Sequence, residues 1–215
     1  MLSQFLFEFG TLFAIINPYG LSFVFLNRTM NLSETERAII ARRVALYAFV
    51  VLAVSLFAGT TILGFFGVSL PALRIAGGLV VAASGWSMLN QKQEGGDRQA
   101  TSTNGMEAVR QEAFFPMTIP LTTGPGTIAT VITLSASHDL SEGPLWPQLV
   151  SVAVLALVSA TILHAYARVS TMARLVGAEG TRVITRLSAF LLLCVGVQIM
   201  MTGVIDALKP LLPPA

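Results

Sequence analysis

The sequence predicts an all-α integral membrane protein with six transmembrane helices, arranged as two inverted three-helix repeats in which helices 1 and 4 are broken mid-membrane. The first observation is composition: 54% of the 215 residues are hydrophobic and 11% are charged, whereas about 25% of the residues in a soluble domain are charged. The second observation is a pair of apolar segments interrupted by proline and glycine. The third is a one-sided distribution of lysine and arginine.

Long stretches without charged residues predict the spans, because a helix needs about 20 mostly apolar residues to cross a bilayer core of about 30 Å. The spans cover roughly residues 5–26, 44–65, 71–89, 114–136, 147–167 and 187–206. Glu8 and the absence of an early basic residue argue against a cleavable signal peptide at the start of the first span. Six such segments leave too little polar sequence to cover them, which excludes a soluble protein with a large core. Asn31 or Ser33 is expected to cap a helix that runs directly into the second span.

Proline and glycine interrupt the first span at Asn17-Pro18-Tyr19-Gly20 and the fourth span between Pro120 and Gly126. Pro18 lacks a backbone N–H and is expected to hold Asn17 in an extended conformation. Matched interruptions in two halves are typical of a transporter binding site, because the freed N–H and carbonyl groups can contact a ligand. Kinks that only shape helix packing are the alternative. The predicted substrate-binding residues are Asn17, Pro18, Gly20, Thr122, Thr123, Gly124, Pro125, Gly126 and Gln198.

The predicted membrane domain divides into a first three-helix repeat (1–89), a polar cytoplasmic linker (90–113) and a second three-helix repeat (114–215). Asn17-Pro18 aligns with Gly124-Pro125 at an offset of 107 residues. Because each half contains an odd number of spans, the second half enters the membrane from the opposite side. Of the 13 basic residues, 11 fall in connections on one side of the membrane. Cytoplasmic loops carry such an excess, so both termini are expected in the periplasm.

Individual side chains in the spans carry further expectations. Arg74 either extends toward the outer membrane surface or pairs with Asp206. Small residues dominate the third span and predict close helix packing, with a substrate passage along that face as the lesser alternative. Cys194 is expected to be a buried, inert thiol. Gln198 hydrogen-bonds either a substrate or another helix. The sequence contains no pattern for a catalytic group, metal site, phosphate-binding loop or cofactor, so no enzyme is expected. Basic residues that flank membrane spans predict no nucleic-acid partner.

Three motifs keep the order and spacing of a known family. They are Asn17-Pro18-x-Gly20, Pro71-Ala72-Leu73-Arg74-Ile75-Ala76-Gly77-Gly78 and Pro120-Leu121-x-x-Gly124-Pro125-Gly126-Thr127-Ile128. Through them the chain resembles the MarC family of six-span bacterial and archaeal inner-membrane proteins. The wider group is similar to LysE-type amino-acid exporters. The resemblance implies a multi-pass protein of the bacterial inner membrane, with its site around the two proline breaks.

Some relatives within the MarC family are described as transporters of small neutral amino acids. The resemblance therefore implies secondary transport of a solute such as glycine or alanine, coupled to H⁺ or Na⁺. Many members carry a smaller residue than Tyr19 after the Asn-Pro pair, so this side chain is expected to narrow the site. Export of other small metabolites or drugs, and a membrane scaffold without transport, are the alternatives. The expected partners are a small-molecule substrate and the lipid bilayer, and a homo-oligomer is left open.

Overall fold

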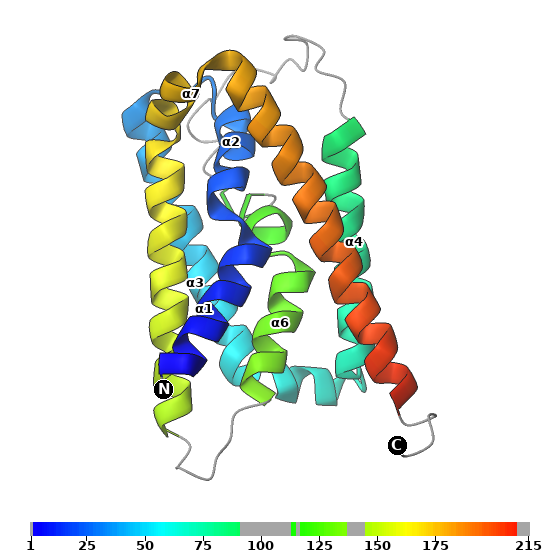
Figure 1. Cartoon of the computed structure of the whole chain (residues 1–215). Coiled ribbons are helices and arrows are strands. Elements are labelled where there is room, and N and C mark those ends of the chain that lie inside the picture. Colours follow the sequence, from blue (N-terminus) through cyan, green and yellow to red (C-terminus); the bar gives the residue numbers. More distant parts are fainter. Residues whose placement is uncertain (1, 91–112, 115–116, 137–144, 210–215) are drawn as a thin grey trace.

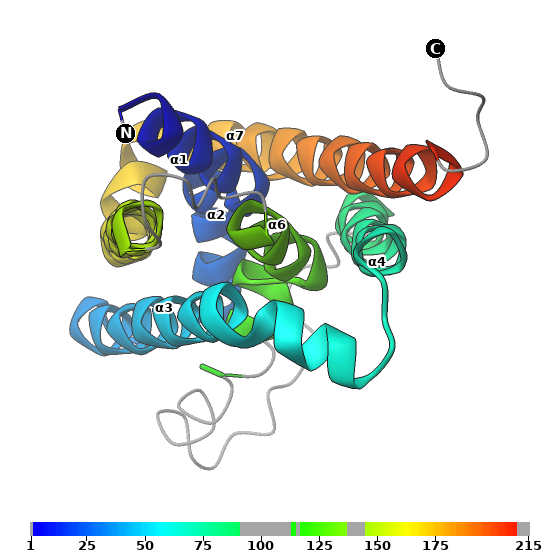
Figure 2. The same ribbon diagram turned by 90° about the horizontal axis from the view of Figure 1, so that it is seen from below.

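The computed structural model describes residues 2–90, 113–114, 117–136 and 145–209, and every regular element in these ranges is helical. The elements are α1 (Leu2–Ile16), α2 (Pro18–Arg28), α3 (Glu34–Phe65), α4 (Leu70–Asn90), η1 (Met117–Thr122), α6 (Pro125–Ala136) and α7 (Leu145–Leu208). The long helices run alongside one another, and α1 begins at the same end of the bundle at which α7 ends (Figure 1). Viewed along the bundle, α2 and α6 lie at its centre (Figure 2).

Five helical segments in the described ranges are long and apolar enough to cross a membrane. They are Leu2–Arg28, Glu34–Phe65, Leu70–Asn90, Trp146–Gly177 and Glu179–Leu208. A shorter apolar helix, α6, occupies 12 residues of the expected fourth span. Gly177, with φ 74° and ψ 175°, separates the last two segments within α7. The all-helical membrane prediction is confirmed, and the division into two inverted repeats stays a prediction. The predicted linker lies almost wholly outside the described residues.

The second long span begins at the predicted cap. The Ser33 side chain accepts a hydrogen bond from the Glu36 backbone N–H, and the Glu36 carboxylate accepts one from the Ser33 backbone N–H at 2.9 Å. This reciprocal capping box satisfies two donors that a helix start otherwise leaves unpaired. The helix then continues without interruption to Phe65, as the sequence predicts.

Aromatic side chains fill the centre of the bundle. Phe23, Phe25 and Tyr166 are almost completely buried, and the rings of Phe25 and Tyr166 stack with centroids 4.6 Å apart. The outer surface is also apolar, with Phe65 and Leu175 more than 80% exposed. Cys194 belongs to this surface: it is exposed, so the prediction of a buried thiol is wrong. In a membrane helix an apolar sequence does not distinguish the protein core from the lipid-facing side, because both are apolar.

Small residues bring α4 and α7 into backbone contact. A Cβ atom added to Gly78 would lie 2.6 Å from the carbonyl oxygen of Gly196, and one added to Gly85 would lie 2.8 Å from that of Ala189. Neither position has room for a side chain. The close packing predicted for the third span is therefore confirmed, and its partner is the second half of α7.

Candidate functional site

The first candidate region is the junction between α1 and α2. Asn17 has φ 44° and ψ 59°, so it is left-handed and the predicted extended conformation is wrong. Asparagine tolerates this conformation because its short polar side chain can hydrogen-bond locally. Here the Asn17 Oδ1 accepts the backbone N–H of Gly20 at 3.3 Å and caps α2. Pro18 occupies the first helical turn, where a missing N–H costs nothing.

At Gly20 this junction packs closely against α7, in the second half of the chain. A Cβ atom at Gly20 would overlap the hydroxyl of Ser188 on α7 as well as the Asn17 amide. Ser188 is buried, at 5% exposure. The α1–α2 junction therefore sits directly against α7, with no space between them for a side chain at position 20.

The second candidate region is the junction between η1 and α6. Ile119 has extended backbone angles (φ −111°, ψ 124°) within η1. The Thr122 hydroxyl donates to the Met117 carbonyl at 2.7 Å and lies 2.9 Å from the Tyr166 hydroxyl of α7. The Thr123 hydroxyl is fully buried and donates to a carbonyl of η1 at 3.1 Å. These hydroxyls thus stabilise the irregular backbone that the sequence predicts here.

Helix α4 contacts this second junction through a glycine. A Cβ atom at Gly77 would lie 2.9 Å from the Pro125 carbonyl oxygen and 3.1 Å from the Gly126 nitrogen. Gly126 in turn packs against Val81, one turn further along α4. The last helix of the first half therefore packs directly against the first turn of α6.

A cavity of about 410 Å³ lies between these elements. Its lining comes from α1, α2, α4, α7 and the η1–α6 junction: Ile15, Arg28, Val80, Val81, Ala83, Ser84, Ser87, Met88, Leu121, Thr122, Gly124, Pro125, Thr127 and Leu192. Three of the nine predicted site residues are in this lining, namely Thr122, Gly124 and Pro125. The lining is mostly apolar, with hydroxyls from α4 and α6 and one cationic side chain, Arg28.

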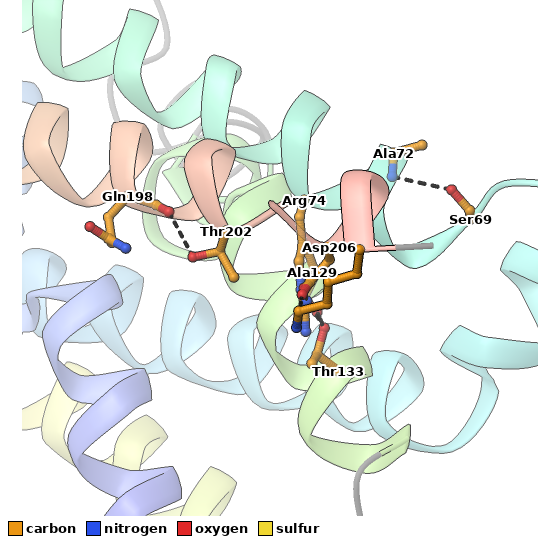
Figure 3. Close-up of polar contacts among 9 residues, drawn as sticks. Ser69, Ala72, Arg74, Ala129, Thr133, Gln198, Thr202 and Asp206 are labelled. Carbon is orange, nitrogen blue, oxygen red and sulfur yellow. Dashed lines mark hydrogen bonds and ion pairs between the residues drawn. The ribbon is translucent and has the colours of Figure 1, made fainter. Parts of the chain in front are cut away.

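The other predicted site residues lie outside this lining. Pro18, Gly20, Thr123 and Gly126 are buried in the protein, while Asn17 is partly buried. Gln198 is exposed on α7, where its carbonyl accepts the Thr202 hydroxyl at 2.9 Å. Figure 3 shows Gln198 apart from the nearby charged group.

That charged group ties three helices together near the end of the bundle where α7 ends. Arg74 of α4 forms an ion pair with Asp206 of α7, as one of the two predictions for Arg74 has it. The Arg74 Nε also donates to the Thr133 hydroxyl of α6 at 3.2 Å (Figure 3). Lys209 approaches the other carboxylate oxygen of Asp206 at 2.6 Å. None of these side chains lines the cavity, so their role here is to join α4, α6 and α7.

The chain matches the model of the MarC family integral membrane proteins over residues 2–208. This chain belongs to the MarC family. It is 35% identical over 204 residues to the inner membrane protein MarC of Salmonella typhimurium, with 92% of each chain covered. It is 35% identical over 206 residues to the protein of that name from Citrobacter koseri and 34% identical over 204 residues to the one from Escherichia coli, again with 92% of each chain covered. No solved structure matches it.

Membership of the MarC family agrees with the helical architecture and makes this chain a multi-pass inner-membrane protein. The three motifs that predicted the family lie in α1–α2, in α4 and at the η1–α6 junction. Sequence reasoning missed Arg28 and Ser87 as cavity residues, and it offered the face of the third span that carries Ser84 only as an alternative substrate passage. Hydropathy assigns a charged residue at a span end to a loop, and the face of α4 that lines the cavity is set by its glycine contacts with α7. Neither signal reveals which polar side chains meet in space.

Proposed function

We propose that this MarC-family protein is a secondary transporter that moves small neutral amino acids, such as glycine or alanine, across the inner membrane. The observation that carries the proposal is the cavity, which is lined by Gly124 and Pro125 of the second junction and by Ile15 of α1, two residues before Asn17. Irregular backbone within a membrane protein is tolerated where it is buried or lines a cavity. Transporter sites of known type have this construction.

The size and lining of the cavity favour a small solute. Its volume of about 410 Å³ is near the lower limit of ligand pockets, which span about 300–1,000 Å³. Apolar side chains such as Val80, Val81 and Leu192 contribute most of the walls. The hydroxyls of Ser84, Ser87 and Thr127 can orient a bound solute by hydrogen bonding. This lining suits a solute with a short apolar side chain and a compact polar group.

The proposal includes an inverted repeat with breaks at mid-membrane and both termini in the periplasm. Two observations support it. The first junction interrupts a 27-residue apolar segment near its middle, since α1 ends at Ile16 and α2 begins at Pro18. Arg28 ends α2 and Arg37 lies near the start of α3. The α2–α3 connection lies at the opposite end of the bundle from the start of α1 (Figure 1). Cytoplasmic connections carry such basic residues. The transport is driven by a proton or sodium gradient, with no catalytic residue, cofactor or metal.

Uptake by proteoliposomes tests the function. Purified protein is reconstituted into sealed vesicles, and entry of labelled glycine and alanine is followed under an imposed proton or sodium gradient. We expect gradient-dependent uptake that protein-free vesicles lack. A folded protein that moves neither amino acid under either gradient contradicts the proposal and favours a scaffold; movement of other small solutes alone favours the exporter alternative.

Two substitutions test the position of the site. Gly124→Leu fills the cavity and should abolish uptake, whereas Gly64→Leu is the matched control because nothing lies within 4 Å of a Cβ atom there. Asn17→Ala removes the capping amide and places alanine in the left-handed region at a cost of about 1–2 kcal/mol, so it too should abolish uptake. Asn17→Gly keeps the backbone conformation and separates that effect from the amide. Wild-type uptake in both Gly124→Leu and Asn17→Ala would refute the site assignment.

A further inference from the structure

The described residues that line the cavity carry positive charge only. Arg28, the last residue of α2, is the only charged side chain among the residues that line it. Among the residues that the structure describes, no Asp or Glu belongs to the lining. A cation at a mostly apolar cavity, with no acidic side chain in the described lining, attracts an anionic group by Coulomb interaction.

Within the described chain, Arg28 differs from the arginines that hold the fold together. Arg37 is buried and donates to the Thr29 carbonyl at 2.8 Å and to the Leu32 carbonyl at 3.0 Å. Arg74 is paired with Asp206. Arg28 makes no hydrogen bond or ion pair with any residue that the structure describes, and its side chain is exposed at the cavity. No described residue therefore occupies its guanidinium donors, which a bound molecule can contact.

A buried hydroxyl on the α6 side of the cavity is also available. Thr127 is only 3% exposed, lines the cavity and makes no hydrogen bond to a described residue. It lies in the first turn of α6, where the first intrahelical bond runs from the Ile128 N–H to the Gly124 carbonyl at 3.1 Å. The N–H groups before Ile128 have no partner within the helix, and this end carries a partial positive charge. The cavity thus presents donors from both α2 and α6.

We infer that the cavity recognises its solute through a single carboxylate, and that Arg28 is the residue that selects it. This inference deepens the proposed function, on which it rests for the meaning of the cavity. Arginine presents a planar fork of donors that matches a carboxylate with two parallel hydrogen bonds. Because the described lining contains no acidic side chain, it offers an amino group only neutral oxygen atoms. The carboxylate is therefore required for binding, and the amino group is not.

A lipid headgroup phosphate is a second anion that Arg28 could bind in place of a solute carboxylate, since Arg28 lies at the end of α2. The cavity favours the solute, because the Arg28 side chain lines the same space as Thr122 and Thr127 at the η1–α6 junction. A test in lipid-free detergent separates the two sources, with phosphatidylglycerol added back as its own arm.

The experiment measures thermal protection of the purified full-length protein by propionate, by alanine and by propionamide, the uncharged counterpart of propionate. We expect propionate and alanine to raise the unfolding temperature and propionamide to have no effect. Arg28→Gln should need at least about tenfold more propionate or alanine for half-maximal protection, as loss of a charged hydrogen bond implies. Arg42→Gln removes the same charge from an exposed residue outside the lining and should match the wild type.

Three results would overturn the inference: equal half-protection concentrations in Arg28→Gln and Arg42→Gln, equal protection by propionamide and propionate, or protection by phosphatidylglycerol but by neither carboxylate. The readout is binding, so it is independent of flux. Carboxylate protection that depends on Arg28, without uptake in vesicles, refutes the transport proposal and leaves the inference standing. Uptake with no Arg28-dependent protection refutes the inference and leaves transport standing.

Discussion

The contact between α4 and α7 predicts that a single methyl group at Gly78 destabilises the protein. An added Cβ would lie 2.5 Å from the Met200 nitrogen, 2.6 Å from the Gly196 oxygen and 2.9 Å from the Met200 Cα. All three are backbone atoms, which cannot rotate away as a side chain can. The two helices must separate to accept the methyl group. Overpacking of this kind costs about 1–3 kcal/mol.

The opposite effect is expected where a glycine faces open space. Gly10 and Gly64 have no atom within 4 Å of an added Cβ. Alanine at an exposed helical glycine is favoured by about 0.5–1 kcal/mol, since it loses less backbone freedom on folding. The free energy of unfolding of the Gly78→Ala protein should therefore be about 1.5–4 kcal/mol lower than that of the Gly10→Ala and Gly64→Ala proteins.

Far-UV circular dichroism during thermal unfolding in a mild detergent measures this difference for all three variants under one condition. Gel filtration before heating establishes that each variant is a single species. The reasoning would be refuted if Gly78→Ala unfolded at or above the temperature of Gly64→Ala, because the helices would then separate without cost.

Three further substitutions follow from named contacts. Arg37→Met removes the hydrogen bonds that join the end of α2 to α3 and should lower the free energy of unfolding by about 2–4 kcal/mol. Arg42→Met, at an exposed position, should change it by less than about 0.5 kcal/mol. Equal unfolding temperatures for the two variants would contradict this expectation. Ser33→Ala removes the capping box and should lower stability by about 1 kcal/mol, seen as fraying of the start of α3 in hydrogen exchange. Tyr166→Phe removes the hydroxyl beside Thr122 and should cost about 1 kcal/mol, measured by the same thermal assay.

Much of the fold follows from the sequence because its signals are local. Hydropathy identifies the long spans, and Ser33 followed by Glu36 is a short-range pattern for a helix start. The Arg74–Asp206 pair was predictable because membrane charges are few and seek a partner. The conformation of Asn17 was predicted wrongly, since the restriction imposed by Pro18 competes with the local hydrogen bond of the Asn17 amide to Gly20. The restriction before proline favours an extended Asn17, whereas the hydrogen bond from the Gly20 N–H to the Asn17 side chain accompanies the left-handed conformation that is observed.

The candidate site was only half predictable. Proline and glycine indicate irregular backbone at the junctions, and Gly124 and Pro125 do line the cavity. The other walls depend on which face α4 turns inward, and that face is decided by tertiary contact with α7. Arg28 illustrates the limit: its charge assigns it to a loop, whereas its place at the end of α2 brings it to the cavity.

Each junction packs against a helix from the other half of the chain. Gly20 of the first junction packs against Ser188 of α7, and Gly77 of α4 packs against Pro125 of the second junction. In the proposed repeat, α4 corresponds to the second half of α7, so these two contacts are equivalent to one another. The proposed repeat predicts such a pair of contacts, and it agrees with a cavity whose lining comes from both halves of the chain.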